Sequence, residues 1–224
     1  MSDVVILEGP DAASYLQGQI TQDVRPLTTG DTTWTFVLEP NGRVQSLARL
    51  ACTGDERYEL TVDGGFGAPL RDRLARFKLR VKAELSLVEG TPEASDSGDA
   101  APLTDDAAAR VVAGWPTMGR EIEPGETIPA ETGLNALAVS FTKGCYTGQE
   151  LVERMDARQA TAPKRLVRLT GDAMLTEGQE LTAGGKVIGR VTTAAGLDGL
   201  GYVARSVVDG RSLDAAIDVV TVTH

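Results

Sequence analysis

The sequence predicts an α+β domain followed by a small β-rich domain. Apolar runs and helical spacing alternate in the order β-α-β-β-β-α-β up to Leu87. After Pro163 the chain changes to short β-rich runs separated by Gly and Asp, which is typical of a small barrel. Hydrophobic residues make up 42% of the chain, which is enough for a packed core. We therefore predict a body over residues 1–160 and a barrel over residues 161–224.

Elements of the first half follow from apolar runs and turn signals. Strands are expected over residues 4–7, 34–38, 43–52, 57–62 and 79–87. Asp11 is expected to cap a first helix. A second helix is expected around Leu70, Leu74 and Phe77, with arginines on its outer face. Asn41-Gly42 predicts a hairpin turn, because these residues tolerate the positive φ that a tight turn needs.

In the second half, composition separates loops from regular elements. Residues 90–106 are predicted to form a mobile surface loop, and residues 110–133 to be irregular but ordered. A helix is expected at about Gly148–Ala157. The β-rich runs of the barrel cover residues 165–170, 180–183, 186–193, 201–205 and 217–223.

Charge and the rare residues exclude several classes of protein. The net charge of −10 predicts no nucleic-acid partner, since an acidic surface repels phosphate backbones. The one histidine, His224, is the last residue and is expected to be frayed, so His-based catalytic triads and His-rich zinc sites are not expected. Two cysteines, Cys52 and Cys145, can supply neither four thiolates to a cluster nor a disulfide framework. No resident metal is expected.

The chain is expected in the cytoplasm. The N-terminal stretch MSDVVILEGPD lacks the basic region and long apolar region of a signal peptide. No run approaches 18 consecutive apolar residues, so no membrane contact is predicted.

The most informative motif is KGCYTGQE at residues 143–150. Thr147 and Glu150 have the spacing of a capping box, which places the N-cap of a helix at Thr147. Glu150 and Arg154 can pair at i,i+4 along that helix. Cys145 then lies just before a helix N-terminus and two residues after Lys143, and both neighbours favour the thiolate.

Such a thiolate is nucleophilic, redox-active or able to ligate a soft metal. The competing interpretation is structural, because free cysteine is among the most buried residue types. Cys52, within an alternating strand, is predicted to be a core residue, and Trp34 and Trp115 to be core or pocket wall. Gly144 and Gly148 allow close backbone approach or a sharp bend.

The KGCYTGQE motif resembles the K-G-C-[YF]-x-G-Q-E signature of the YgfZ family, folate-binding relatives of the glycine-cleavage T-protein (aminomethyltransferase) implicated in iron–sulfur cluster assembly and repair. The similarity extends over nearly the whole chain. Further matching stretches are residues 9–12, 15–19, 21–24, 40–43, 110–116, 128–131, 189–193 and 200–205.

This resemblance implies an α+β, T-protein-like body around a central cavity, with a small C-terminal β-barrel and tetrahydrofolate or another folate derivative in the cavity. Arginine and lysine are needed to hold the carboxylates of a folate tail, and polar groups with a flat apolar wall are needed for the pterin. The candidate cofactor-binding residues are Gln19, Arg43, Arg110, Trp115, Glu131, Tyr146, Gln149 and Arg154, with Lys143 a further candidate for the folate tail. The candidate catalytic residues are Cys145 and Lys143.

One departure from the T-protein concerns the reaction. The T-protein has an acidic pair after its hairpin glycines, whereas this chain has Gln45-Ser46 there, and neither residue ionises at neutral pH. The acidic pterin-contacting position matches Val112. Whether the chain is an enzyme is therefore left open.

Three functions follow as hypotheses. The first is a tetrahydrofolate-binding accessory factor that acts through Cys145, with iron–sulfur client or assembly proteins as partners. The second is a folate-dependent aminomethyltransferase or demethylase, which the missing acidic pair disfavours. The third is a non-catalytic scaffold in which the signature is structural. Neither the client, the folate form, the oligomeric state nor the redox or ligand role of Cys145 follows from the sequence.

Overall fold

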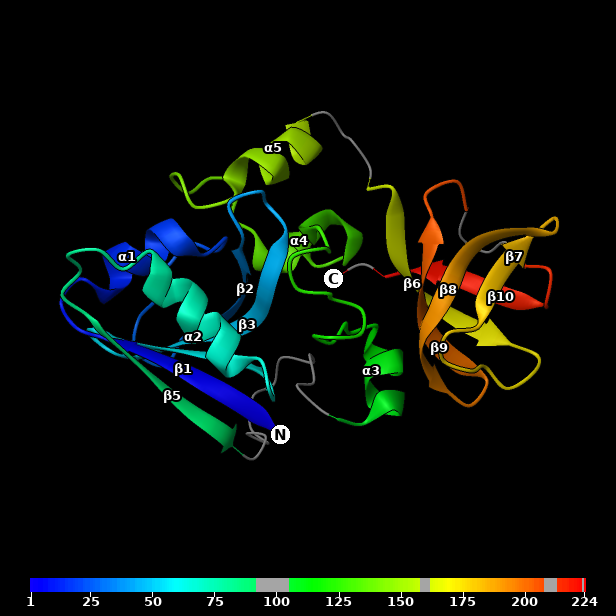
Figure 1. Ribbon diagram of the computed structural model, residues 1–224, viewed down its shortest axis with the longest axis horizontal. Helices are drawn as coiled ribbons and strands as arrows, with labels where there is room; N and C mark the ends of the chain where they lie inside the picture. The colour runs from blue at the N-terminus through cyan, green and yellow to red at the C-terminus, as the bar shows by residue number, and fades with distance from the viewer. Residues whose placement is uncertain (92–104, 158–161, 208–212, 223) are drawn as a thin grey trace.

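The computed structural model describes residues 1–91, 105–157, 162–207, 213–222 and 224, and shows two β-sheets lying side by side (Figure 1). The first sheet and its helices form the body, and the second sheet lies beyond helix α3. No helix among the described residues is both long and apolar enough to cross a membrane. The predicted 90–106 loop lies mostly outside the described residues.

The body is built on a five-stranded antiparallel sheet in the order β2-β3-β4-β1-β5. Its strands are β1 (Ser2–Glu8), β2 (Thr32–Leu38), β3 (Val44–Gly54), β4 (Arg57–Asp63) and β5 (Glu84–Thr91). The predicted turn at Asn41-Gly42 joins β2 to β3, and Gly42 has φ of +82°. The element order β-α-β-β-β-α-β is confirmed.

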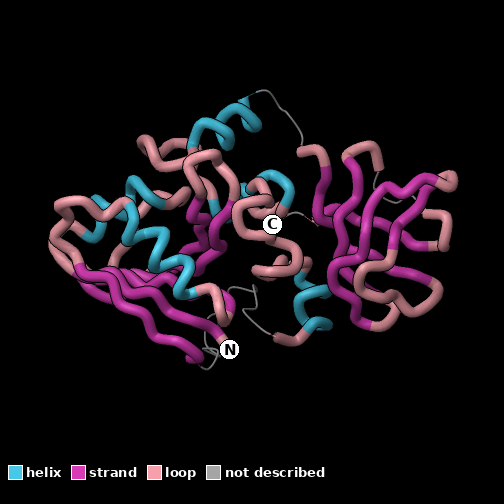
Figure 2. Tube along the Cα trace, viewed as in Figure 1, coloured by secondary structure: helices cyan, strands magenta, loops and turns pink. Residues whose placement is uncertain are grey.

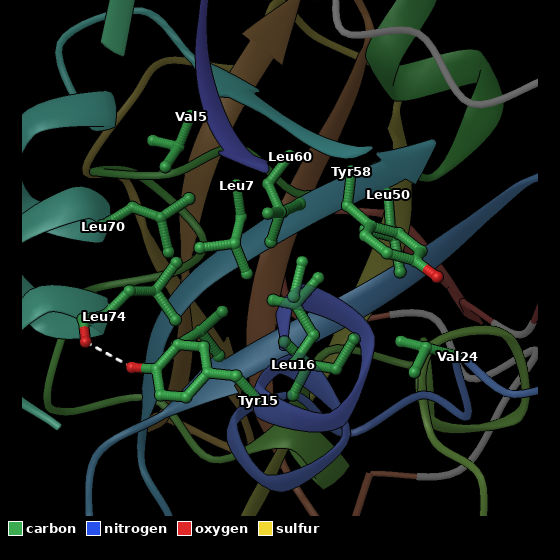
Figure 3. Close-up of a cluster of buried hydrophobic side chains, with 14 of the residues drawn as sticks. Val5, Leu7, Tyr15, Leu16, Val24, Leu50, Tyr58, Leu60, Leu70 and Leu74 are labelled. Carbon is green, nitrogen blue, oxygen red and sulfur yellow. Dashed lines mark hydrogen bonds between the residues drawn. The ribbon is translucent and has the colours of Figure 1, made fainter. Parts of the chain in front are cut away.

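Helices α1 (Ala12–Gln19) and α2 (Gly67–Arg76) cover one face of this sheet (Figure 3). Apolar side chains of both helices meet those of the central strands in one buried cluster. Tyr15 of α1 donates its hydroxyl to the carbonyl of Leu74 in α2, which ties the two helices together. Cys52 is buried in this cluster, as predicted.

The opposite face of the sheet is covered by the segment between residues 115 and 152. This segment and its flanks contain helices α3 (Ala107–Ala113), α4 (Asn135–Ala138) and α5 (Gln149–Ala157), and the 3-10 helix η1 (Pro129–Glu131). Trp34 and Trp115 pack together there with ring centroids 4.5 Å apart. Their prediction as core residues is confirmed.

The second sheet is antiparallel in the order β10-β6-β9-β8-β7 and encloses a separate apolar cluster (Figure 2). Its strands are β6 (Lys164–Gly171), β7 (Glu180–Ala183), β8 (Lys186–Ala195), β9 (Asp198–Ala204) and β10 (Ile217–Thr221). All five β-rich runs predicted after Pro163 are therefore strands. The predicted boundary at residue 160 lies outside the described residues and stays a prediction.

Several local predictions are wrong. Arg73 does not face outward from α2, because it lies beside Leu70 and Leu74 on the buried face and is 1% exposed. Asp11 is the N-cap residue of α1, as predicted, but its carboxylate makes no capping bond and accepts the backbone N–H of Lys82 instead. The predicted strand over residues 79–87 begins at Glu84, and Leu79 is 82% exposed.

Further corrections concern residues 107–113 and the C-terminal residue. Helix α3 occupies part of a segment predicted to be irregular, and Asp106 caps it by accepting the N–H of Ala108. Its short apolar run was obscured by the prolines and glycines that follow it. His224 packs its ring edge-on against Trp115 at 5.3 Å, so it is not frayed.

The two sheets are joined through buried polar contacts around Glu121. Thr193 of β8 donates its hydroxyl to the Glu121 carboxylate at 2.7 Å, and Tyr202 of β9 donates to the Glu121 carbonyl at 2.9 Å. Outside this seam, Arg168 of β6 donates to the carbonyl of Val112 in α3. These contacts hold α3 and the segment that follows it against the second sheet.

Candidate functional site

The segment carrying Cys145 lies against residues 18–22, which are the end of α1 and the residues that follow it. Ser140 donates its N–H to the Thr21 carbonyl at 3.0 Å, and Thr147 donates its N–H to the Gly18 carbonyl at 3.0 Å. The Thr21 hydroxyl returns a bond to the Ala138 carbonyl at 2.6 Å. These hydrogen bonds therefore join two stretches that both resemble the family and that lie more than a hundred positions apart in the chain.

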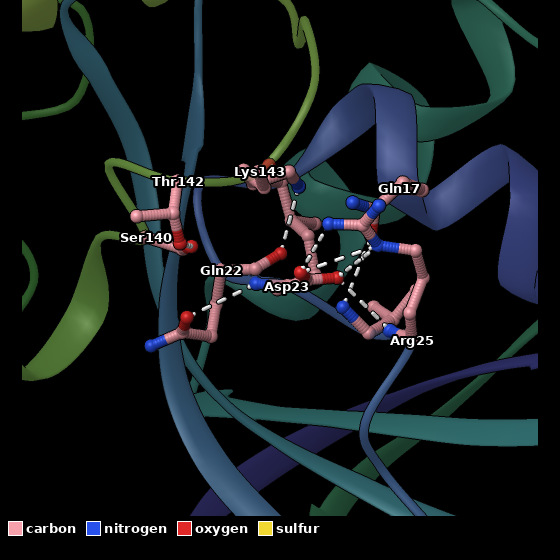
Figure 4. Close-up of polar contacts among 9 residues, drawn as sticks. Gln17, Gln22, Asp23, Arg25, Ser140, Thr142 and Lys143 are labelled. Atoms are coloured by element: carbon pink, nitrogen blue, oxygen red, sulfur yellow. Dashed lines mark hydrogen bonds and ion pairs between the residues drawn. The ribbon is translucent and has the colours of Figure 1, made fainter.

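Lys143 is buried in this junction (Figure 4). Its ammonium donates to the carbonyls of Ile20 at 2.8 Å and Gln22 at 2.7 Å. It also lies 5.2 Å from the centroid of the Tyr146 ring, a cation–π contact. Burial lowers the pKa of Lys143 to about 8, while the nearby Asp23 carboxylate acts in the opposite direction.

The thiol of Cys145 is exposed, whereas Cys52 is buried. Gly144 beside it is also exposed, and a Cβ added at Gly144 meets nothing within 4 Å. Tyr146 on the other side is buried, and burial raises the pKa of its phenol to about 12. Cys145 therefore occupies an open position between two buried side chains, Lys143 and Tyr146.

Helix α5 starts at Gln149, within one residue of the predicted start, but the predicted capping box does not form among the described residues. Thr147 directs its hydroxyl to the Gly18 carbonyl, and Glu150 pairs with Arg154. The i,i+4 pair was predicted correctly. Gln149 takes the role expected of Glu150, because its side-chain oxygen accepts the N–H of Tyr146 at 3.3 Å.

The β2–β3 hairpin packs against the segment that carries Cys145. A Cβ added at Gly148 would lie 2.7 Å from the Glu39 carbonyl and 3.2 Å from the Gly42 Cα. Gly148 also has φ of +84°, so both the space and the backbone conformation require glycine. The bend predicted at Gly148 is present, and it lets α5 cross the hairpin at backbone contact distance.

Of the predicted cofactor-binding residues, Trp115 and Tyr146 share the buried apolar cluster on the face of the sheet opposite α1 and α2. Arg110 belongs to the last turn of α3, and its carbonyl accepts the N–H of Trp115 at 2.9 Å. The Arg110 side chain is 4% exposed, and its Nε and Nη1 atoms have no hydrogen-bond partner. A buried guanidinium with unused donors fits an anionic or acceptor-rich ligand, which a folate is.

The other predicted cofactor-binding residues already have protein partners and do not gather in one place. Gln19 accepts from Arg73 at 3.1 Å, and Arg43 contacts Glu126. Glu131 in η1 lies 3.8 Å from Lys164 of β6, and burial raises the pKa of its carboxyl. Gln149 donates to Glu153, and Arg154 pairs with Glu150 at the exposed side of α5.

Sequence reasoning missed three buried polar residues near these groups. Arg73 had a signal, because it lies three residues after Leu70 and therefore on the helix face that Leu70 and Leu74 bury. Asp63, at the end of β4, accepts the N–H of Met118 at 2.9 Å, and its burial raises the pKa of the carboxyl. Ser46, at the position of the missing acidic pair, has a buried hydroxyl with no partner. Val112 is 75% exposed.

The chain is similar to several known proteins. The family described as the CAF17 C-terminal beta-barrel domain matches residues 164–224. The chain is 26% identical to an aminomethyltransferase of Nostoc, over 89% of this chain and 47% of that protein. It is 26% identical to the tRNA-modifying protein YgfZ of Vibrio vulnificus, over 75% of this chain and 67% of that protein. It is 34% identical to the human mitochondrial iron-sulfur cluster assembly factor IBA57, over 45% of this chain and 30% of that protein.

Among solved structures, the glycine cleavage system aminomethyltransferase T of Bartonella henselae superimposes with a TM-score of 0.82, covering 100% of this chain and 83% of that one. At 16% identity this likeness establishes the fold alone. The chain spans about half the length of the Nostoc aminomethyltransferase. The resemblance predicted from KGCYTGQE and its flanking stretches is confirmed: the chain is a homologue of the YgfZ and IBA57 proteins and of aminomethyltransferases, with the T-protein fold and a C-terminal β-barrel.

Proposed function

We propose that this chain is a tetrahydrofolate-binding accessory factor for the assembly or repair of iron–sulfur cluster proteins, and that it acts in the cytoplasm through Cys145. The observation that carries the proposal is the exposed thiol at a position held between two buried neighbours, Lys143 and Tyr146. A thiol that is exposed to solvent while its neighbouring side chains are buried is suited to contact another molecule.

The relatives support the choice of partner. The human relative is named an iron-sulfur cluster assembly factor, and the Vibrio relative a tRNA-modifying protein. Two cysteines cannot supply the four thiolates of a cluster, and Cys52 is buried. A cluster handled at Cys145 therefore takes its remaining ligands from a client or assembly protein.

The folate part of the proposal is supported by Arg110. Its buried Nε and Nη1 atoms lack partners, and the aromatic side chains of Trp115 and Tyr146 lie buried together in one apolar cluster. These three residues are proposed to hold the cofactor, Arg110 by hydrogen bonds and the aromatic residues by packing. Bound tetrahydrofolate supplies nitrogen atoms that can accept a one-carbon unit.

The proposal is tested by replacing each cysteine in turn. Cys145→Ala is expected to abolish complementation of iron–sulfur enzyme activities in cells that lack the native gene, while the purified variant keeps its circular dichroism spectrum and melting temperature. Cys52→Ala is the matched control, because it removes a thiol that is buried and remote from the motif. Normal cluster-enzyme activities in cells carrying Cys145→Ala would refute the proposed role.

A second candidate, folate-dependent aminomethyl transfer or demethylation, is favoured by the identity with the Nostoc aminomethyltransferase. Gln45 and Ser46 argue against it, since neither supplies a carboxylate. Turnover of an aminomethyl or N-methyl donor with tetrahydrofolate would establish this activity. A purely structural motif is distinguished from both, because Cys145 would then react with iodoacetamide no faster in the folded protein than in the urea-unfolded chain.

A further inference from the structure

The two ends of the Cys145 segment are fastened to the same stretch of chain. Lys143, two residues before the cysteine, is bonded to the carbonyls of Ile20 and Gln22. Thr147, two residues after it, is bonded through its N–H to the carbonyl of Gly18. Gly144 and Cys145 lie exposed between these attachments, so the position of the sulfur depends on both of them.

Among the described residues, both hydrogen bonds of the Lys143 ammonium go to backbone carbonyls, and its ring contact is with Tyr146. The charged groups that face the ammonium are Asp23 and Arg25, which pair with each other. Two of its donors are therefore directed into the junction with residues 20–22 (Figure 4).

We propose that Lys143 is a positioning residue: it fixes the geometry of the segment that presents Cys145, and does not act on the sulfur itself. This differs from the expectation that its charge lowers the pKa of the thiol. The inference rests on the proposed function only for its consequence in cells, because it concerns a contact that exists in the isolated protein.

Two physical points support a positional role. Two hydrogen bonds and a cation–π contact hold the side chain in place, which offsets part of the cost of burying an ammonium. In addition, burial lowers the pKa of Lys143 to about 8, so its full positive charge is lost as the pH rises past that value. A neutral amine retains two N–H donors, so the attachment to Ile20 and Gln22 outlasts the charge.

Two substitutions separate position from charge. Lys143→Met removes both the attachment and the charge, whereas Lys143→Arg keeps the charge but replaces a compact ammonium with a planar fork. Lys186→Met, at an exposed lysine of β8, is the control. Purified variants are compared by hydrogen exchange of the amides of residues 144–147 and by the pH midpoint of Cys145 alkylation with iodoacetamide, followed by peptide mass spectrometry.

If Lys143 positions the segment, the amides of residues 144–147 exchange roughly tenfold faster or more in Lys143→Met than in the wild type, because the hydrogen bonds of Lys143 are lost. Lys143→Arg also accelerates exchange, and neither variant moves the alkylation midpoint. Lys143→Arg retains a cation and still decides the question if Lys143→Met does not fold. A midpoint raised in Lys143→Met and normal in Lys143→Arg, with exchange as in wild type, would overturn the proposal.

A cellular measurement then links the two proposals. Lys143→Met is expected to lower cluster-enzyme activities in an otherwise wild-type chain and to add nothing in a chain that already carries Cys145→Ala. If Cys145→Ala has no effect in cells, the proposed function fails, while the exchange and alkylation measurements still decide the role of Lys143.

Discussion

Arg73 and Arg110 are both buried arginines, and their surroundings differ. Arg73 donates to the Leu38 carbonyl and to Gln19, and its guanidinium lies 4.3 Å from the centroid of the Phe77 ring. Arg110 has two nitrogen atoms without a partner. A buried polar group left unpaired costs about 1–3 kcal/mol. Arg73 is thus explained by the fold, whereas Arg110 is the residue that we propose to contact a folate.

At this scale we predict that Arg110→Met lowers tetrahydrofolate affinity by about 10- to 100-fold, the effect of losing hydrogen bonds from a charged donor. The same variant is expected to change the melting temperature of the ligand-free protein little, because no hydrogen bond from Nε or Nη1 is lost and only the electrostatic attraction to Asp63 and Asp105 is removed. Calorimetric titration and thermal denaturation measure the two effects.

Arg73→Met is the matched control for that experiment. It breaks a satisfied buried cluster and is expected to lower the melting temperature clearly. Unchanged folate affinity in Arg110→Met, with a lowered melting temperature, would show that Arg110 is a structural residue like Arg73.

The elements around the site are held by close backbone contact between the β2–β3 hairpin and the start of α5. Gly42 and Gly148 face each other, and a Cβ at either one meets backbone or Cβ atoms at 3.0 Å or less. Both have positive φ. The β2–β3 hairpin and the start of α5 therefore cross at these two glycines. The close approach requires glycine at both positions, although they lie far apart in the chain.

We predict that Gly148→Ala destabilises the protein by about 1–3 kcal/mol, because it adds left-handed strain and a steric conflict with the hairpin. Gly144→Ala, four residues earlier in the same motif, is expected to change stability by less than about 0.5 kcal/mol, since a Cβ there meets open space. Urea unfolding of both variants measures the difference. Equal losses would mean that the hairpin does not constrain the motif.

For the whole molecule, the seam between the body and the second sheet depends on Glu121. Its carboxylate accepts the hydroxyl of Thr193 and the N–H of Thr117, and its carbonyl accepts the hydroxyl of Tyr202. Both barrel residues that contact it are buried. A buried carboxylate is costly unless it accepts hydrogen bonds from such donors. The interface between the body and the second sheet therefore depends on specific polar contacts.

We predict that Thr193→Val lowers the free energy of unfolding by about 1–3 kcal/mol, because one oxygen of the buried Glu121 carboxylate loses its donor. Thr170→Val is the matched control: the Thr170 hydroxyl bonds to Asp198 at 2.8 Å, but on the exposed surface. Equilibrium denaturation followed by tryptophan fluorescence, which reports on Trp34 and Trp115 in the body, compares the two. Equal effects would show that the seam contributes nothing specific.

Residue chemistry and periodicity determined much of this protein without a structure. The succession of helices and strands along the body, the Asn41-Gly42 turn, helix α5 and the five barrel strands all follow from local patterns, since each depends on neighbours in sequence. The KGCYTGQE motif was also sufficient to place the chain among its relatives.

The tertiary structure alone decided where the buried charges point. The hydrogen bonds of Lys143 and those of Glu121 join segments far apart in the chain, and composition does not encode which backbone carbonyl will meet an ammonium. Local patterns fail there because a buried donor is satisfied by whatever the fold brings within 3 Å, and that depends on long-range packing.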